Sequence, residues 1–132
     1  MRPHYFRTKK SKYNATKVVV DGDVYDSKKE ARRGVELTLA EKVGKIENLR
    51  RQVKYILIPE QREPDTVGPR GGKKKGKLIE KEIAYIADFV YEQDGQTIVE
   101  DVKGYKGGQS YAVFSMKRKM MLYFKGIRVK EV

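Results

Sequence analysis

Cysteine is absent from the 132 residues of this chain, which excludes disulfides, thiolate metal sites and thiol nucleophiles. That absence is typical of proteins of a reducing cytoplasm. Long apolar runs are also missing, so we expect no segment that crosses a bilayer. The N-terminal stretch is basic with no apolar segment behind it, and we expect no secretory signal there.

What the chain has in excess is positive charge. Thirty Lys and Arg residues face 18 Asp and Glu residues, a formal net charge of +12. An excess of this size on a small domain indicates a polyanionic partner, most often a nucleic acid. A membrane surface is the weaker option, because no strongly amphipathic basic helix is evident. Charge alone does not distinguish an enzyme from a passive binder.

By composition the chain divides into a basic N-terminal segment and one domain, and the domain itself contains a second basic segment. Residues 1–16 are basic and polar, and we expect a flexible arm that is either solvated or laid on phosphates. Residues 17–132 have the size and the 39% hydrophobic content of a single domain. Within that domain, residues 59–80 are rich in Gly, Pro and Lys and predict a flexible basic loop. That loop lacks the Gly-Lys-Ser/Thr ending of a nucleotide-binding loop.

Hydrophobic periodicity and turn residues predict the remaining elements. A hairpin over 17–25 precedes a helix over 28–43, strands over 49–58, 85–91 and 97–103, a helix over 111–124 and a strand over 127–132. The order αβββαβ after an N-terminal hairpin predicts an α/β fold of the α+β type, with a central mixed sheet flanked by helices.

The first helix has a clear start and a regular apolar pattern. Ser27 followed by Glu30 three residues later is the pattern of a capping box. Ala31, Leu39 and Val43 belong to a set of apolar residues that recurs every four positions, and we expect this set to be buried.

Acidic residues inside two neighbouring predicted strands are the candidate catalytic and metal-binding residues. Asp88 lies among apolar neighbours, where an ionised group is costly without a partner. Asp101 and Lys103 are two residues apart, so both point to one face of their strand, whereas Glu100 points to the other unless a bulge intervenes. The Asp94-Gly95 turn makes the two strands a hairpin. Two carboxylates and one ammonium can therefore meet in a volume suited to a hard divalent cation and an activated water.

This arrangement resembles the PD-(D/E)xK nuclease superfamily, and within it small phage and prophage proteins that form a domain of unknown function. The likeness rests on Tyr25–Ala31, Tyr85–Phe89, Glu100–Gly104 and Lys117–Lys119, which together span most of residues 17–132. The Pro that often precedes the first Asp of the pattern is Ala87 here. The resemblance implies a restriction-endonuclease-like core and a Mg²⁺-dependent DNA endonuclease of a bacterial host or phage-infected cell, with Mn²⁺ as a substitute metal and no organic cofactor.

The resemblance also implies roles for individual residues. Asp88 and Asp101 are expected to be metal ligands, and Lys103 is expected to orient or deprotonate the attacking water or to balance charge on the phosphate. Superfamily members often supply a third acid from the first helix, which makes Glu30 a candidate beside its capping role. Glu36 is the alternative helix acid.

Basic clusters outside the strands are candidate DNA contacts, since lysine and arginine neutralise phosphates without reading sequence. They are Arg70, Lys73, Lys74 and Lys75 on the loop and Lys117, Arg118 and Lys119 on the second helix. Gln52 is interpreted as an exposed strand residue, with a polar contact to the site or to DNA as the alternative. Cutting both strands usually requires a symmetric homodimer, which we expect here.

The substrate stays open at this stage. Branched or recombination intermediates are the first expectation, because no base-reading module is evident. A sequence-specific or mismatch-nicking endonuclease is one alternative. A non-catalytic basic nucleic-acid-binding protein of the same fold is the other.

Overall fold

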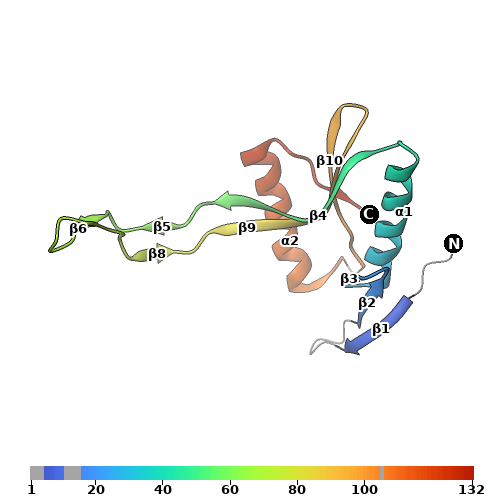
Figure 1. Ribbon diagram of the computed structural model, residues 1–132, viewed down its shortest axis with the longest axis horizontal. Helices are drawn as coiled ribbons and strands as arrows, with labels where there is room; N and C mark the ends of the chain where they lie inside the picture. Colours follow the sequence, from blue (N-terminus) through green and yellow to red (C-terminus); the bar gives the residue numbers. More distant parts are fainter. Residues whose placement is uncertain (1–4, 11–15, 105) are drawn as a thin grey trace.

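The computed structural model describes residues 5–10, 16–104 and 106–132, and within these residues the body is a four-stranded sheet with helices on both faces (Figure 1). The strand order is β11 (Lys130–Glu131), β10 (Gln96–Asp101), β9 (Ile83–Gln93) and β4 (Glu47–Ile58). β11 runs parallel to β10, and the other neighbours are antiparallel. The predicted α+β class, with its central mixed sheet, flanking helices and N-terminal hairpin, is confirmed.

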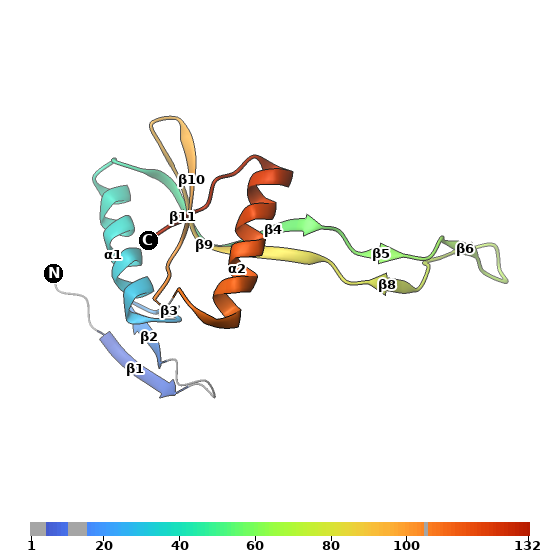
Figure 2. The same cartoon turned by 180° about the vertical axis from the view of Figure 1, so that it is seen from behind.

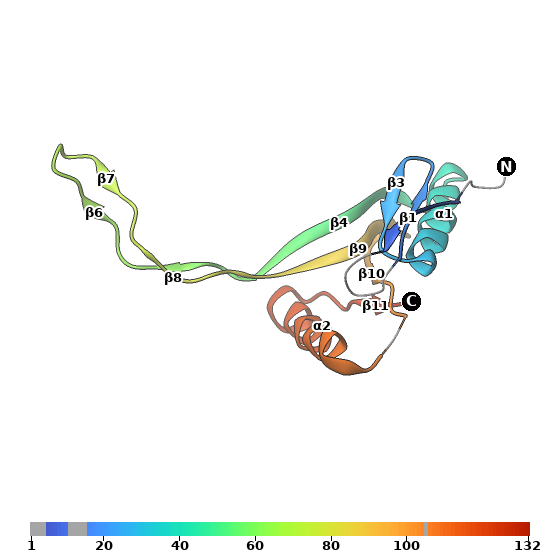
Figure 3. The same cartoon turned by 90° about the horizontal axis from the view of Figure 1, so that it is seen from below.

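Helices α1 (Lys28–Lys42) and α2 (Gly108–Met120) lie on opposite sides of the sheet (Figure 3). A π-helical turn, η1 (Met121–Lys125), follows α2 directly. No helix in the described residues has both the length and the apolar content needed to cross a membrane.

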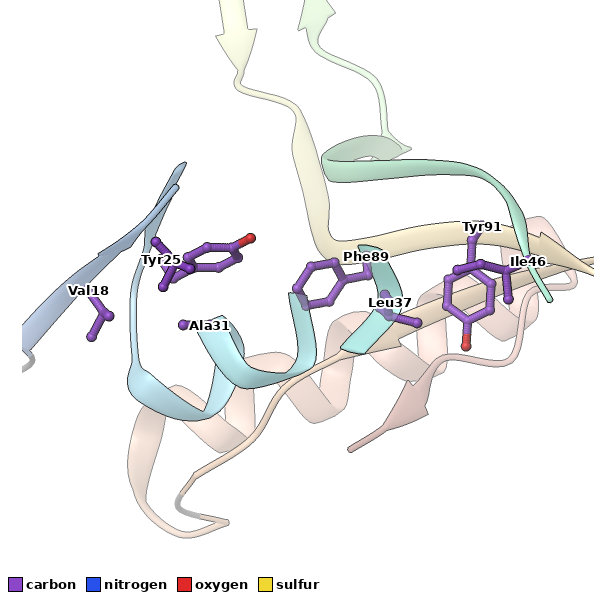
Figure 4. Packing of buried hydrophobic residues seen from close by; sticks show 8 residues of the cluster. Val18, Tyr25, Ala31, Leu37, Ile46, Phe89 and Tyr91 are labelled. Atoms are coloured by element: carbon purple, nitrogen blue, oxygen red, sulfur yellow. The ribbon is translucent and has the colours of Figure 1, made fainter. Parts of the chain in front are cut away.

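Each helix covers its own hydrophobic cluster. The α1 cluster, shown close up in Figure 4, contains Val18, Val20, Tyr25, Ala31, Leu37, Ile46, Phe89 and Tyr91. The α2 cluster contains Leu57, Tyr85, Ala87, Val90, Val99, Phe114, Met121 and Val129. The sheet is therefore buried on both faces, and any exposed polar site must lie where its strands end or separate.

The face that α1 buries differs from the predicted one. Ala31 is fully buried, as expected, but Leu39 and Val43 are 61% and 64% exposed. An α-helix turns about 100° per residue, so a repeat of four drifts by roughly 40° at each step. By Val43 the set has rotated off the contact face. Gly34 and Leu37, three and six residues after Ala31, are buried instead.

The N-terminal hairpin consists of β2 (Thr16–Val20) and β3 (Asp23–Tyr25), and it packs beside α1. A further strand, β1 (Tyr5–Lys10), pairs antiparallel with β2. Residues 5–10 of the predicted arm over residues 1–16 thus form a strand whose backbone pairs with the edge of the hairpin. The rest of that predicted arm, residues 1–4 and 11–15, lies outside the described residues.

The largest departure from the sequence prediction is residues 59–82, which we call the hairpin arm. It continues the β4 and β9 strands as a two-stranded ribbon that projects from the body (Figures 1 and 2). Its ladders pair β5 (Gln61–Arg62) with β8 (Leu78–Glu80) and β6 (Thr66–Val67) with β7 (Lys73–Lys74). Main-chain pairing thus gives residues 59–80 short strands where the sequence predicted a loop, without any apolar alternation.

Candidate active site

Asp88 and Asp101 occupy the point where β9 and β10 part. Glu100 and Phe89 form the last residue pair of the two strands, and the next positions in this register are Asp101 and Asp88. The Oδ2 atom of Asp88 accepts a hydrogen bond of 2.8 Å from the backbone amide of Val102. The two predicted carboxylates therefore lie on adjacent strands at one place, as the hairpin prediction requires.

The sheet is irregular at this place. Tyr85 and Ala87 belong to the α2 cluster, whereas Phe89 and Tyr91 belong to the α1 cluster. A regular strand would put all four side chains on one face, so the alternation breaks at Asp88. On the neighbouring strand β4, Gln52 has φ = 52°, which is left-handed backbone in mid-strand. Local strain of this kind gathers at functional sites.

Asp101 is buried and holds Lys103. The Tyr85 hydroxyl donates a hydrogen bond of 2.7 Å to Oδ2 of Asp101, and the Lys103 ammonium lies 2.8 Å from Oδ1. The same ammonium sits 3.9 Å from the centroid of the Phe114 ring on α2. A carboxylate and an aromatic face thus fix the position of the Lys103 charge.

Glu30 serves both the helix cap and the site. Its backbone amide donates to Oγ of Ser27 at 3.1 Å, and its Oε2 accepts from the backbone amide of Asp26 at 2.9 Å. Its other oxygen, Oε1, accepts from Nε2 of Gln52 at 3.2 Å. The capping role and the site role are therefore compatible, because each uses a different carboxylate oxygen.

Gln52 links two of the acids. Its side-chain Nε2 also lies 3.4 Å from Oδ1 of Asp88, so one amide reaches both Asp88 and Glu30. Gln52 is an exposed strand residue, as interpreted from the sequence, and it also makes the polar contact to the site that was the alternative. The signal that could have found it is register, since Gln52 falls opposite Asp88 between the β4–β9 pairs Arg51–Phe89 and Val53–Ala87.

Electrostatics distinguish Asp88 from an ordinary surface acid. The pKa of Asp88 is raised to about 7, chiefly by burial and also by the nearby Asp101 and Glu30 carboxylates, against the opposing effects of the Val102 amide and Lys103. Burial also raises the pKa of Glu30, with contributions from Asp26 and Asp101. The raised pKa values of Asp88 and Glu30 indicate that a positive charge bound beside them would be favourable.

The fit to a metal ion follows from the donor set. Within the described residues, no three Asp, Glu or His side chains are placed so that together they could hold a metal ion. Mg²⁺ does not require three such side chains, because it usually takes one or two carboxylates and keeps several waters. Asp88, Asp101 and Glu30 supply carboxylate oxygens of the type that Mg²⁺ prefers, in a cluster whose Asp88 carries a raised pKa.

Glu36 and Glu100 lie outside this cluster. Glu36 forms an ion pair of 3.0 Å with Arg33 one turn away on α1. The same arginine donates two hydrogen bonds, of 2.7 and 2.8 Å, to the fully buried Glu100 carboxylate, which also accepts from the Tyr91 hydroxyl. Burial alone would raise the pKa of Glu100, but these hydrogen bonds outweigh it and lower the pKa. Glu100 therefore ties the sheet to α1.

Arg51 is a site residue that the sequence analysis did not single out. Its guanidinium lies 3.8 Å above the Tyr25 ring, and its Nη2 is 3.8 Å from Oε1 of Glu30. Its Nε is buried and has no hydrogen-bond partner. Its place on β4 beside Gln52 is the signal that could have found it. The arrangement puts a fixed positive charge next to the helix acid.

The two predicted DNA-contact clusters lie apart from each other. Arg70, Lys73, Lys74 and Lys75 are at the far end of the hairpin arm, whereas Lys117, Arg118 and Lys119 are in the last turn of α2. Arg118 is engaged within the body, 3.6 Å from the Glu131 carboxylate and 3.4 Å from the Tyr111 hydroxyl. These contacts make Arg118 a packing residue of α2, next to the half-buried Lys117 and the exposed Lys119.

A family model described as "Protein of unknown function (DUF1064)" matches residues 10–131. The chain belongs to this family. The part that matches DUF1064 contains Glu30, Gln52, Asp88, Asp101 and Lys103, together with the whole hairpin arm. Comparison with curated proteins gives no match, and comparison with solved structures gives none.

Proposed function

We propose that the chain is a Mg²⁺-dependent DNA endonuclease of the PD-(D/E)xK type, which hydrolyses phosphodiester bonds. One observation carries the proposal. Two adjacent strands bring Asp88 and Asp101 to the point where they separate, and Asp101 is paired with Lys103 at 2.8 Å. A carboxylate pair with an ammonium two residues further along the chain can hold a divalent ion and assist an attacking water.

Asp88 and Asp101 would hold the ion, with Glu30 as a third ligand directly or through water. The ion supplies Lewis-acid charge and a lowered pKa for water. Lys103, fixed between Asp101 and the Phe114 ring, orients the attacking water or offsets charge developing on the phosphate. Gln52 holds the Glu30 and Asp88 carboxylates toward each other through its amide.

Cleavage of plasmid DNA and four-way junctions in Mg²⁺ or Mn²⁺ tests the proposal. We expect Asp101→Ala and Lys103→Ala to lose at least about a hundredfold in rate, the scale of a lost catalytic group. Lys45→Ala, which removes an exposed lysine at the far end of α1, is the charge-matched control and should cleave like the wild type. Equal cleavage by all four proteins would refute the endonuclease.

The substrate we propose is branched DNA of the kind formed in phage recombination or replication. Because the described residues form one body and the hairpin arm, with no separate base-reading module among them, we favour selection by shape over selection by sequence. Comparing junctions with defined linear and mismatched duplexes distinguishes this from a sequence-specific or mismatch-nicking enzyme. The cysteine-free composition supports work in the cytoplasm of a bacterial host or phage-infected cell.

A non-catalytic DNA-binding protein is the second candidate, and the net charge of +12 favours it. It predicts DNA binding that is unchanged by EDTA and no heat of Mn²⁺ binding in calorimetry. The endonuclease predicts Mn²⁺ binding that disappears in Asp88→Asn.

We further propose a homodimer, since two sites are needed to cut two strands. It is supported by apolar side chains that stay exposed at helical spacing on α2 and η1. Val113 and Met116 are 41% and 56% exposed, and Tyr123 and Phe124 are 84% and 50% exposed. Light scattering with and without DNA should give twice the chain mass; a monomeric mass in both conditions would contradict the dimer.

A further inference from the structure

Packing does not explain the hairpin arm. All of residues 59–83 are described, and none of them is buried. The arm stands away from both helices in every view (Figures 1, 2 and 3). Since no apolar burial stabilises it, its form points to a task outside the body.

The arm nevertheless has a specified shape. At its middle, Arg62 donates to the Gly76 carbonyl at 3.0 Å, and the Gly76 amide donates to Oδ1 of Asp65 at 3.0 Å. A Cβ atom at Gly76 would lie 1.8 Å from the Glu63 carbonyl oxygen, so only glycine fits this backbone crossing. A solvated linker has no need of such a fit.

The tip is a tight turn that presents an arginine. The Gly71 amide donates to the Gly68 carbonyl at 3.0 Å, and Gly71 has φ = 77°. Proline at the second position of such a turn and a left-handed glycine after it are the residues that this geometry favours. Arg70 therefore occupies the apex, between Pro69 and Gly71.

Charge is graded along the arm. From Thr66 to Ile79 the sequence contains five basic residues and no acidic ones, whereas the acids Glu60, Glu63, Asp65, Glu80 and Glu82 all lie nearer the body. Lys73 and Lys75 pair with two of these acids, Asp65 and Glu60, at 3.4 and 3.6 Å. Among described residues, no carboxylate lies within ion-pair distance of the remaining three: Arg70, Lys74 and Lys77. The free positive charge is therefore concentrated at the distal end.

We propose that the hairpin arm is a second DNA contact, which grips duplex DNA more than one helical turn away from the carboxylate cluster. At about 3.3 Å per residue, the strand from Ile58 to Arg70 spans roughly 40 Å. One turn of duplex is about 34 Å. A two-stranded ribbon is narrow enough for the major groove, and the basic tip can neutralise phosphates there. The substrate class is then DNA with a long duplex flank, an inference that rests on the proposed endonuclease only for the position of the cut.

Binding measured without any metal tests the arm independently of catalysis. Fluorescence anisotropy in EDTA would compare blunt duplexes of about 10 and about 30 base pairs, roughly one and three helical turns. The tip variant Arg70→Ala/Lys73→Ala/Lys74→Ala would be matched by Lys42→Ala/Lys45→Ala/Lys125→Ala, which removes three exposed charges from the body. Circular dichroism of both triple variants confirms that each is folded.

We expect the wild type to bind the long duplex about tenfold more tightly than the short one, because the arm adds phosphate contacts. The tip variant should lose this advantage and keep its affinity for the short duplex. Its slope of log K against log salt on the long duplex should fall by about 2 to 3, near 0.9 for each lost contact. The body variant should keep the advantage of the long duplex. The arm contact would be overturned if the two triple variants had equal affinities for the long duplex. It would also be overturned if the tip variant lost as much affinity for the short duplex as for the long one.

The two proposals fail in different ways. If Asp101→Ala still cleaves DNA while the tip variant loses only long-duplex affinity, the endonuclease assignment fails and the arm contact stands. If Asp101→Ala abolishes cleavage while the tip variant binds both duplexes like the wild type, the arm contact fails and the endonuclease assignment stands.

Discussion

Asp88 accepts a hydrogen bond from the backbone amide of Val102 at 2.8 Å, one residue beyond the end of β10. The bond crosses from β9 to the neighbouring strand at the place where the ladder stops. It therefore fixes the path of the chain between Asp101 and Lys103, and gives the Asp88 carboxylate a structural contact besides its proposed metal. Asparagine is the informative replacement, because its side-chain oxygen can keep this bond while the charge is lost.

Asp88→Asn should raise the free energy of unfolding at pH 8 in EDTA. Burial and two nearby acids raise the pKa of Asp88 to about 7, so the folded protein holds this proton more tightly than the unfolded chain does. The stability gained from the protonated form is full below about pH 4, the ordinary range of an aspartate, and is lost as pH rises through 7. Relative to the wild type, Asp88→Asn should gain about 2 kcal/mol more at pH 8 than at pH 5.

Urea denaturation of both proteins at pH 5 and pH 8 measures this difference. Asp94→Asn, in the exposed turn between β9 and β10, removes the same charge and should show no such pH dependence. A constant difference between Asp88→Asn and the wild type at the two pH values would contradict a raised pKa at Asp88.

Mn²⁺ affinity should depend on pH through the same carboxyl. A metal ligand must be deprotonated, so below pH 7 the ion has to displace a proton from Asp88. We expect binding at pH 6 to be up to about tenfold weaker than at pH 8, with proton release detectable by calorimetry in buffers of different ionisation heat. In Lys45→Ala the pH dependence should be that of the wild type. Equally tight Mn²⁺ binding at pH 6 and pH 8 would show that the ion does not displace a proton from Asp88.

Arg33→Ala should destabilise the fold without touching the cluster of carboxylates. The Glu100 side chain is fully buried, and the variant would leave it with no cationic partner apart from the more distant Lys130. Removing one partner of a buried ion pair costs about 3–5 kcal/mol. Because the pKa of Glu100 is lowered in the folded state, the stability from this pair is present above the ordinary glutamate range and is lost as pH falls through the folded pKa.

Arg32→Ala is the matched control for this change. Arg32 precedes Arg33 on the exposed side of α1, and its removal should alter the free energy of unfolding by less than about 0.5 kcal/mol. Equal losses in the two variants, measured by urea denaturation at pH 7, would mean that the buried pair contributes nothing specific.

Gly34→Ala should destabilise the packing of α1 on the N-terminal hairpin. A Cβ atom at this position would lie 2.6 Å from the Tyr25 ring, closer than real Cβ atoms approach. Overpacking costs about 1–3 kcal/mol, which exceeds the gain of at most about 1 kcal/mol from replacing a helical glycine. A double-mutant cycle with Tyr25→Leu should show the clash relieved, as a positive coupling between the two sites. Additive effects would show that Tyr25 is not the residue that excludes a side chain.

The fold and the centre of the site could be predicted because local signals agreed with the tertiary structure. The Asp94-Gly95 turn, with φ of 51° and 75°, sets the register that places Asp101 next to Asp88. Two-residue periodicity then separates Asp101 from Glu100, which contacts Arg33 on α1. The hairpin register and the facing of Asp101 and Glu100 could both be inferred from residues close together in the sequence.

The parts that were missed depend on contacts distant in sequence or on the backbone alone. Gln52 reaches Glu30 and Asp88 from a strand separated from them by 22 and 36 positions, and its left-handed backbone has no sequence signal. The hairpin arm is held by main-chain pairing between strands of two or three residues, which are too short to show apolar alternation. Its turn residues, Pro69 and Gly71, were the one local signal available.

The hairpin arm lies outside both hydrophobic clusters, so the stability of the body and the contacts of the arm depend on different residues. Because none of its residues is buried or belongs to either hydrophobic cluster, lengthening, shortening or recharging the ribbon should leave both clusters intact. If the arm contacts DNA as proposed, grafting a different hairpin between Ile58 and Ile83 should change which target is preferred and leave the carboxylate cluster in place.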